Sequence, residues 1–479
     1  MSGRMQLDTG DHPVLSGDEL LVREPATGQP LATVTLATAA DVDAAVAAAK
    51  AAQPGWADTP GTERAAVLRR AAAALERHRE EAADWLVREG GAIRGKAEHE
   101  VGAVLDELYA AAGLPTRPNG VLLAAGPGRE SHGRRIPLGV VGVISPWNVP
   151  MLLAARALAP ALALGNAVVL KPDVHTPVSG GRVLARILAE AGLPEGVLQV
   201  LPGDAEPGRA LVEHPDVPMI AFTGSTAVGR GIGAAAGGAL KRVSLELGGN
   251  NALIVLDDAD LEAAASAGAW GSFFHQGQIC MAAGRHLVHR AVADRYLDLL
   301  TEHAAKLRVG DPFREQVDLG PVIDDRQLDR IEGIVRASVA AGARILTGGD
   351  RRGPFYRPTV LAGVTPDMPA FTEEIFGPVA PVTVVADEDE AVELANRTAY
   401  GLSAAVLTGS VARGRALADR LRTGMVHVND QTINDEAHVP FGGRGASGNG
   451  TRHGSEHSWD SYTQWQWLTV RETPARYPF

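Results

Sequence analysis

The sequence predicts an α/β protein with two doubly wound parallel-sheet domains and a small β arm. Between Val140 and Phe222, short apolar segments alternate with helical patterns, which is typical of a parallel sheet covered by helices on both faces. A second alternating unit begins at Asn251 and continues to about Gly443. The length agrees with this division, because 479 residues exceed what one hydrophobic core usually holds.

The first part of the chain predicts a strand pair and helices, followed by an extended hairpin. Residues 20–36 read as two strands around a turn, because Pro25 and Gly28 interrupt the apolar pattern. Residues 41–52 and 62–89 are alanine-rich and have helical periodicity. Residues 120–137 contain short apolar runs separated by glycine, proline and charge, which indicates a hairpin that stands away from the core.

The first alternating unit follows the hairpin, and a last strand closes the chain. Residues 462–470 include TQWQWLTV, whose period of two suits a strand that pairs with a sheet edge. The strands expected in the unit are 140–144, 167–170, 197–201 and 219–222. Three helices are expected between them: one that ends at residue 164, one over 179–191 and one over 207–214.

Composition excludes several classes of protein. The chain has 57 acidic and 45 basic side chains and a net charge of −12, which argues against nucleic acid as a partner. The apolar segment 149–170 is interrupted by Arg156, Pro160 and Asn166, so it predicts a buried helix and strand and no membrane partner. The first thirty residues carry scattered charges without an apolar core, so we expect no signal peptide and a cytoplasmic location.

Cys280 is the only cysteine of the chain. A single thiol cannot form an internal disulfide, so it is either a small core residue or a reactive nucleophile. Lone cysteines are more often core residues. Gly277, Gln278, Ala282 and Gly284 surround it without a β-branched run, which favours a reactive thiol in a loop.

Three polar motifs follow predicted strands, at the sheet edge where open α/β folds bind ligands. Asn148 lies in Ser145-Pro-Trp-Asn-Val-Pro150 and has an amide that can donate to an oxyanion. Lys171 ends the next strand and can reach a ribose or phosphate, although a solvated strand end is the commoner role. The third motif, FTGSTAVG from Phe222, opens a helix whose backbone amides can bind phosphate.

Two carboxylates complete the set of candidates. Glu246 in LELGG lies among apolar residues, so a raised pKa would make it a general base near neutral pH. Glu374 and Phe376 in EEIFGP combine a carboxylate and an aromatic ring, which suits a ribose and a flat ring. Alone, the first motif would be a strand end and the second a helix end.

Taken together, these motifs resemble the NAD(P)-dependent aldehyde dehydrogenase superfamily. PWNVP, KP, FTGSTAVG, LELGG, FxxxGQxC, EEIFGP and PFGG occur in this order over nearly the whole chain. Within the superfamily, FFHQGQICMAAGRHLV and GMVHVNDQTINDEAHVPFGG are similar to the benzaldehyde dehydrogenase branch, which oxidises aromatic aldehydes to acids. An aliphatic aldehyde or semialdehyde dehydrogenase of the same superfamily is the alternative.

The resemblance implies a role for each motif. Cys280 matches the nucleophile, Glu246 the general base and Asn148 the oxyanion donor, and no metal is expected. NAD is the implied cofactor, with NADP as the alternative. The implied cofactor residues are Ser145, Trp147, Lys171, Gly203, Gly224, Ser225, Thr226, Val228, Gly229, Leu247, Glu374 and Phe376. The residues expected to line an apolar aldehyde channel are Val149, Leu152, Arg156, Phe274, Ile279, Met281, Ile433 and Phe441, of which only Arg156 could bind a substrate carboxylate.

The resemblance also implies a domain plan and an assembly. Residues 1–118 and 139–247 would form a Rossmann-like dinucleotide-binding domain, and residues 248–445 the catalytic domain. Residues 119–138 and 446–479 would form an arm that joins subunits into a homodimer or a homotetramer.

Three positions depart from the common family pattern. Val174 stands where many members have a glutamate that binds the adenosine ribose, and loss of this carboxylate removes a repulsion against the 2′-phosphate of NADP. Ala157 and Asn250 stand where lysines are frequent, so a proton relay through those lysines is not expected.

Two other classes of protein can be weighed against a dehydrogenase. A cysteine hydrolase or acyltransferase could use Cys280 with His275 as base, but it would leave FTGSTAVG and EEIFGP without a role. A binding protein without activity would have no need of Cys280, Glu246 and Asn148 together. Formation of NAD(P)H on addition of an aldehyde separates the three classes.

Overall fold

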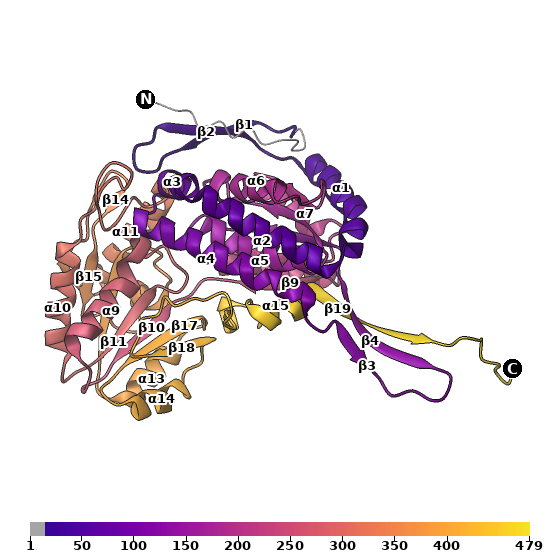
Figure 1. Cartoon of the computed structure of the whole chain (residues 1–479). Helices are drawn as coiled ribbons and strands as arrows, with labels where there is room; N and C mark the ends of the chain where they lie inside the picture. Colours follow the sequence, from indigo (N-terminus) through magenta and orange to yellow (C-terminus); the bar gives the residue numbers. More distant parts are fainter. Residues whose placement is uncertain (1–14) are drawn as a thin grey trace.

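The computed structural model describes residues 15–479 as two helix-covered sheets and a β arm that extends away from them (Figure 1). Residues 1–14 lie outside the described residues, and they are part of the thirty-residue segment on which the expectation of no signal peptide depends. Between residues 15 and 479, no helix combines the length and apolarity that a membrane span needs.

The first sheet is parallel, with strand order β7-β6-β5-β8-β9. Its strands are β5 (Val140–Ile144), β6 (Ala167–Lys171), β7 (Leu198–Val200), β8 (Met219–Thr223) and β9 (Arg242–Glu246). Val141 and Val143 pack into a core on one face, and Val140 and Ile144 pack into a core on the other. Both faces are therefore buried, which explains why β5 and β6 are continuous apolar runs in the sequence.

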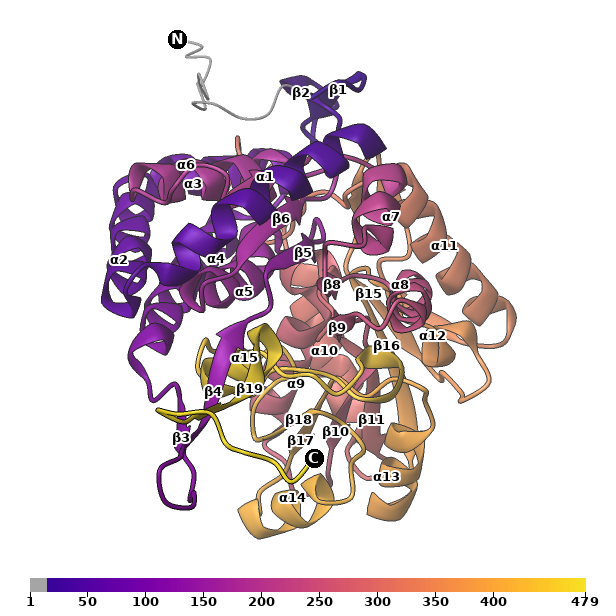
Figure 2. The same cartoon turned by 90° about the vertical axis from the view of Figure 1, so that its right-hand side faces the viewer.

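Helices cover both faces of this sheet, as Figures 1 and 2 show. The helices α2 to α6 lie on one face, and α1, α7 and α8 lie on the other. Their bounds are α1 (Ala39–Asp58), α2 (Gly61–Arg77), α3 (Arg79–Gly90), α4 (Arg94–Ala112), α5 (Pro150–Ala163), α6 (Val183–Glu190), α7 (Ala205–Glu213) and α8 (Thr226–Gly238), with a 3-10 turn at Leu114–Thr116.

Two of the predicted helices are not continuous α-helices. The helix expected over 62–89 is divided at His78, which lies between α2 and α3. The helix expected over 179–191 begins with a π-helical turn at Val178–Arg182. The buried Glu89 carboxylate accepts hydrogen bonds from the backbone N–H groups of Val178 and Ser179, so a side chain from another helix holds this turn.

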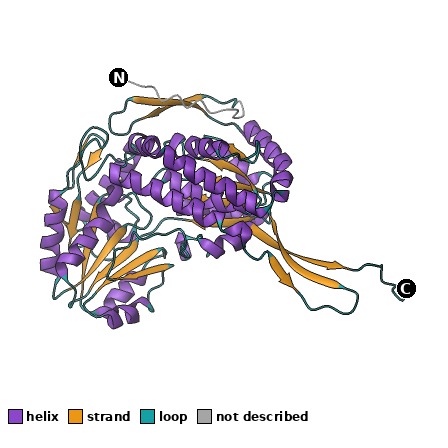
Figure 3. Cartoon of the chain, in the orientation of Figure 1, coloured by secondary structure: helices purple, strands orange, loops and turns teal. Residues whose placement is uncertain are grey.

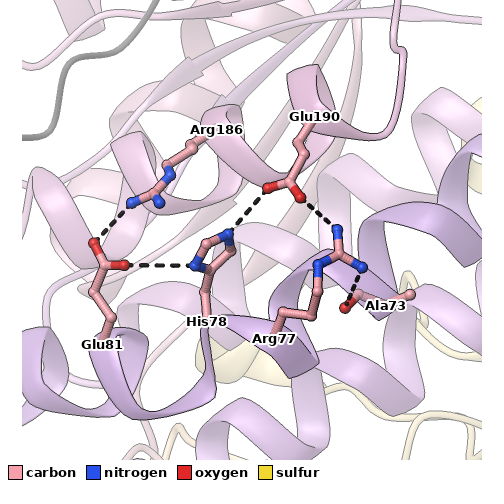
Figure 4. A network of polar contacts seen from close by, with 6 residues as sticks. All are labelled: Ala73, Arg77, His78, Glu81, Arg186 and Glu190. Atoms are coloured by element: carbon pink, nitrogen blue, oxygen red, sulfur yellow. Dashed lines mark hydrogen bonds and ion pairs between the residues drawn. The ribbon is translucent and has the colours of Figure 1, made fainter.

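A network of charged side chains connects the break at His78 to α6 (Figure 4). The His78 ring contacts Glu190 at 3.0 Å and Glu81 at 3.6 Å. Arg186 of α6 bonds Glu81 at 2.7 Å, and Arg77 bonds Glu190. The partners of His78 and Arg77 on α6 lie more than a hundred residues away in the chain, so helical periodicity could not indicate the break.

The second sheet has the order β12-β15-β16-β11-β10-β17-β18. It is parallel except at β12, which pairs antiparallel with β15 and so departs from the purely parallel sheet that was predicted. The strands are β10 (Asn251–Val255), β11 (Ala283–His289), β12 (Arg344–Thr347), β15 (Thr359–Ala362), β16 (Val379–Val385), β17 (Ser403–Leu407) and β18 (Met425–Val428). A small hairpin joins β13 (Arg351–Arg352) and β14 (Phe355–Tyr356).

Helices cover both faces of the second sheet as well, and they complete its two cores. Their bounds are α9 (Leu261–Phe273), α10 (Ala293–Lys306), α11 (Asp325–Ala340), α12 (Pro369–Thr372), α13 (Glu388–Asn396) and α14 (Val411–Ala418), with 3-10 turns at Phe274–Gly277 and Gly445–Ser447.

Two groups of strands lie apart from these sheets. The predicted N-terminal pair is present as β1 (Glu19–Arg23) and β2 (Pro30–Thr35). The arm has the order β19-β4-β3 and contains β3 (Gly120–Leu122), β4 (Glu130–Pro137) and β19 (Thr463–Val470), which follows α15 (Ser455–Tyr462). Figure 3 shows that the outer part of the arm has no helix on it. The predicted edge pairing of TQWQWLTV is found, with β4 of the same chain as the partner.

Candidate active site

The predicted cofactor residues of the first unit meet along one edge of its sheet. All five strands are parallel, so their carboxyl ends lie side by side. Gly203 follows β7, Lys171 ends β6, Ser145 and Trp147 follow β5, the segment 224–229 follows β8, and Leu247 follows β9. The structure therefore brings together residues that are up to about a hundred positions apart in the chain.

Glu374 and Phe376 reach the same edge from the second unit. The Gly249 N–H donates to Glu374 Oε1 at 2.9 Å. A Cβ at Gly248 would lie only 2.1 Å from Glu374 Oε2, so the glycine allows the carboxylate to lie against LELGG. The rings of Phe376 and Trp147 are 5.5 Å apart at 86°, which is an edge-to-face contact between the two units. Phe376 has φ 56°, an uncommon value for a residue other than glycine.

The chemistry of this edge fits a dinucleotide. The Ser145 hydroxyl is buried and has no hydrogen-bond partner in the described part of the chain, so it can bond a ligand. Ser225 caps α8, and the backbone N–H groups of that helix terminus attract phosphate. Lys171 supplies an amine that can donate hydrogen bonds. Glu374 supplies a carboxylate that can accept hydrogen bonds from ribose hydroxyls.

The loop that carries Cys280 is held in an unusual backbone conformation. His275, Gln276 and Gly277 have φ values of 50°, 57° and 67°, so three successive residues lie in the left-handed region. At Gly277 a Cβ would lie 2.2 Å from the Gly377 carbonyl oxygen, which requires glycine. The Asn251 side-chain amide donates to the Cys280 carbonyl oxygen at 2.8 Å and anchors the other end of the loop.

Asn148, the predicted oxyanion donor, lies beside this loop. Its Nδ2 donates to the Gln278 carbonyl oxygen at 2.8 Å, and its second N–H remains for a ligand. Lys96, which the sequence did not indicate, donates from Nζ to the Asn148 carbonyl oxygen at 2.9 Å and to Glu100 Oε2 at 2.5 Å. Glu100 Oε1 accepts from the Met151 N–H at 2.9 Å. A buried ion pair therefore holds the loop that presents the Asn148 amide.

Burial controls the charge of the two candidate catalytic groups. Glu246 ends β9, and its carboxyl oxygens have no hydrogen-bond partner among residues 15–479. Burial raises its pKa well above the usual range, although Arg156 partly opposes this shift. Burial, together with the charges of Glu374 and Glu246, raises the pKa of the Cys280 thiol to about 12. Without ligands, the thiol is therefore protonated at neutral pH.

Cys280 opens into a cavity of about 1200 Å³. Every residue predicted for the aldehyde channel lines it, namely Val149, Leu152, Arg156, Phe274, Ile279, Met281, Ile433 and Phe441. Their role in binding a substrate stays a prediction. The sequence did not indicate Trp270, which is 50% exposed and stacks on Phe274 with ring centroids 4.3 Å apart. The spacing of four residues between these two rings near the end of α9 was the available signal.

Arg156 has a different environment from the one expected. Its Nε donates to Glu107 Oε1 at 3.1 Å, and its Nη2 donates to Asp435. The guanidinium also lies 4.5 Å from the centre of the Phe441 ring. The structure therefore does not support Arg156 as the binder of a substrate carboxylate, because two carboxylates already compensate its charge.

His275 is unsuited to act as the base of a cysteine hydrolase. Within the described residues, neither ring nitrogen has a hydrogen-bond partner, Cys280 included. Burial lowers its pKa well below the usual range, and the positive charge of Lys96 lowers it further. The left-handed backbone and the buried ring indicate a role in shaping the loop.

Comparison with known proteins supplies relatives for nearly the whole chain. The model of the aldehyde dehydrogenase family matches residues 15–468. A vanillin dehydrogenase of an Amycolatopsis species is 54% identical over 472 residues, which are 98% of this chain and 97% of the relative. The benzaldehyde dehydrogenase [NAD(+)] of Pseudomonas putida is 54% identical over 459 residues, which are 96% of this chain and 94% of that protein.

Solved structures have the same fold. A putative aldehyde dehydrogenase from Burkholderia cenocepacia superposes with a TM-score of 0.92 at 36% identity, over 96% of each chain. Betaine aldehyde dehydrogenase from Staphylococcus aureus, solved in complex with NAD+, superposes with a TM-score of 0.93 at 31% identity, over 96% of this chain and 93% of that one.

Proposed function

The chain belongs to the aldehyde dehydrogenase family, and on this basis we propose that it oxidises aromatic aldehydes of the benzaldehyde type to carboxylic acids with NAD. The observation that carries the proposal is the cavity at Cys280, whose walls include the rings of Trp270, Phe274 and Phe441. A flat ring can stack on such walls, whereas a short alkyl chain would bury less apolar surface. Two relatives at 54% identity are named for aromatic aldehydes.

In the proposed mechanism, the Cys280 thiol first releases its proton to solvent, and the thiolate Sγ then forms a bond to the carbonyl carbon of the aldehyde. The Asn148 amide and the Cys280 backbone N–H donate to the resulting oxyanion. Bound NAD supplies the acceptor for the hydride that leaves this carbon. The thioester that remains on Cys280 is hydrolysed by water from which Glu246 takes a proton, and the thiol is regained as the acid departs.

The cofactor residues proposed for this reaction are those at the edge of the first sheet. Lys171 and Glu374 would bind ribose hydroxyls, and the start of α8 would lie at the phosphates. We assign dinucleotide binding to residues 1–118 and 139–247 and catalysis to residues 248–445. With Val174 in place of a glutamate, no carboxylate at this position repels the 2′-phosphate of NADP. A direct comparison of rates with NAD and with NADP therefore decides the cofactor preference.

The arm is proposed to join subunits. Trp465 and Trp467 of β19 are 56% and 68% exposed, and Leu122 of β3 is exposed too. Such a concentration of large apolar side chains on a strand edge favours association with a second copy. The proposal is a homodimer, or a homotetramer built from two dimers.

Initial rates over a panel of aldehydes test the proposed function. Burial of a phenyl group instead of a methyl group is worth roughly 1 to 3 kcal/mol, so kcat/KM for benzaldehyde should exceed that for acetaldehyde by about ten- to a hundredfold. Each aldehyde is assayed with NAD and with NADP. If acetaldehyde equals or exceeds benzaldehyde, the aromatic assignment is wrong, while membership of the family is unaffected.

A further inference from the structure

We propose that a buried chain of three side chains, Ser272, His286 and Tyr296, positions the loop of the nucleophile by closing this loop at its base. The inference rests on the proposed function, because it presumes that Cys280 Sγ attacks the aldehyde. Ser272 lies in α9, His286 in β11 and Tyr296 in α10, and Figure 1 shows these elements together in the second unit. None of the three side chains lines the cavity at Cys280, so they act through the loop.

The chain ends in a hydrogen bond across the base of the loop. Ser272 lies near the end of α9 and Ala283 begins β11, and the segment between them contains Cys280. The Ser272 hydroxyl donates to the Ala283 carbonyl oxygen at 2.8 Å across 11 positions of the chain. This hydrogen bond fixes the distance between the two ends of the loop.

The order of donors along the chain follows from the number of protons. The single hydroxyl proton of Ser272 is used at Ala283, so Ser272 Oγ accepts from His286 Nε2, which lies 2.7 Å away. The ring proton is therefore on Nε2, and Nδ1 accepts from the Tyr296 hydroxyl at 2.7 Å. Burial lowers the pKa of His286 to about 3, so the ring is neutral at the pH of the reaction. The opposite tautomer would take the proton of Ser272 and release Ala283.

The chain is enclosed by the core of the second unit. Ser272, His286 and Tyr296 are each at most 1% exposed. A Cβ at Gly268 would lie 2.1 Å from Tyr296 Oη and 3.0 Å from His286 Cε1, so a glycine of α9 makes the space for these two side chains. Buried polar groups that are all paired hold one arrangement, whereas a partly paired chain is costly. The chain therefore fixes α9, β11 and α10 relative to one another at the base of the loop.

The base of the loop also supports the left-handed turn that precedes the nucleophile. This turn contains His275, Gln276 and Gly277. A Cβ at Gly277 would lie 2.9 Å from the Ser272 carbonyl oxygen, so the turn packs directly on the Ser272 backbone. A backbone in the left-handed region persists only where its surroundings over-determine it. Loss of the hydrogen bond at the base should therefore let the turn relax and move the Cys280 thiol, and a shift of about 1 Å can lower a rate by about a hundredfold.

The test compares Ser272→Ala with the triple variant Ser272→Ala/His286→Leu/Tyr296→Phe. The single variant removes the bond at the base and leaves His286 Nε2–H unpaired in a buried site, so both stability and kcat should fall. The triple variant retains no polar group of the chain, so stability should recover while kcat stays low. Asn251 still holds the Cys280 carbonyl oxygen at 2.8 Å, so we expect kcat to fall by about ten- to a hundredfold. The dissociation constant of NADH, measured by fluorescence, should stay within about twofold of the wild type, because the dinucleotide edge lies elsewhere.

Thr383→Val is the matched control, because Thr383 has a buried hydroxyl in the same sheet that donates to the Val364 carbonyl oxygen at 2.8 Å. Its stability should fall, while kcat stays within about twofold of the wild type. If kcat recovers together with stability in the triple variant, the chain has only a structural role and the proposal is overturned. Every protein is assayed with the aldehyde that the wild type oxidises best. A preference for aliphatic aldehydes would therefore overturn the proposed function and leave this test intact.

A second measurement uses the wild-type enzyme, so it does not depend on the folding of any variant. Neutron diffraction from crystals of the perdeuterated enzyme locates the deuterium atoms of the chain. The Ser272 hydroxyl should point to the Ala283 carbonyl oxygen, and the ring deuterium of His286 should be on Nε2. A Ser272 hydroxyl that points to the His286 ring would overturn the proposal, because the base of the loop would then be open.

Discussion

Replacement of Lys96 by methionine should damage stability and catalysis together. Lys96 is buried, and its ammonium group donates to Glu100 at 2.5 Å and to the Asn148 carbonyl oxygen at 2.9 Å. Methionine has a similar length but cannot donate. The variant therefore leaves Glu100 as a buried carboxylate without a counter-charge and releases the loop that carries Asn148.

The expected magnitudes follow from burial and from the contacts that remain. Removal of one partner of a buried ion pair costs about 3 to 5 kcal/mol. Glu100 still accepts hydrogen bonds from the Met151 and Leu152 N–H groups at 2.9 and 3.2 Å. We therefore expect a loss of unfolding free energy at the lower end of this range, about 3 kcal/mol. Complete loss of an oxyanion donor lowers kcat by about 10²- to 10³-fold. A displaced Asn148 amide should lower it by at least about tenfold.

Chemical denaturation and initial rates of NADH formation measure the two effects. The double variant Lys96→Met/Glu100→Gln removes the unpaired charge, so it should recover stability while kcat stays low. Lys50→Met is the control, because Lys50 is 60% exposed and pairs with Asp216 at the surface. It should change stability by less than about 1 kcal/mol. If Lys96→Met has the unfolding free energy and kcat of the wild type, the assignment of Lys96 as a positioning residue is wrong.

Four further outcomes are expected. Cys280→Ala should abolish hydride transfer while NAD still binds, because the nucleophile and the dinucleotide edge are separate; loss of NAD binding in the folded variant would count against this assignment. Glu246→Gln should give a burst of NADH and then slow turnover, since the base is needed mainly for thioester hydrolysis, and an unchanged steady-state rate would remove Glu246 from the mechanism. Because the pKa of the Cys280 thiol is about 12 without ligands, the rate of its alkylation by iodoacetamide should increase about tenfold per pH unit between roughly pH 7 and 10. A rate that stops increasing near neutral pH would contradict the raised pKa. Deletion of Thr463–Phe479 removes β19 and should give monomeric or insoluble protein, whereas an active oligomer of unchanged size on gel filtration would contradict the role of the arm.

The sequence by itself determined the features that depend on local pattern. The strands β5 and β6 are buried on both faces, so each is a continuous apolar run that can be recognised in isolation. Polar motifs directly after such strands must meet at one sheet edge, because parallel strands share the direction of their carboxyl ends. The motifs of Asn148, Lys171 and Glu246 could therefore be placed near one another before the structure was known.

Only the tertiary structure decided which distant side chains meet. Arg156 pairs with Glu107, which is 49 positions away, and with Asp435, which is 279 positions away. Lys96 reaches Asn148 across 52 positions. Helical and strand periodicity arise from neighbours within a few residues, so they carry no information about such pairs. The packing of α4 on α5 and of the loop after β18 on the cavity creates these contacts, which set the charge at the proposed substrate site.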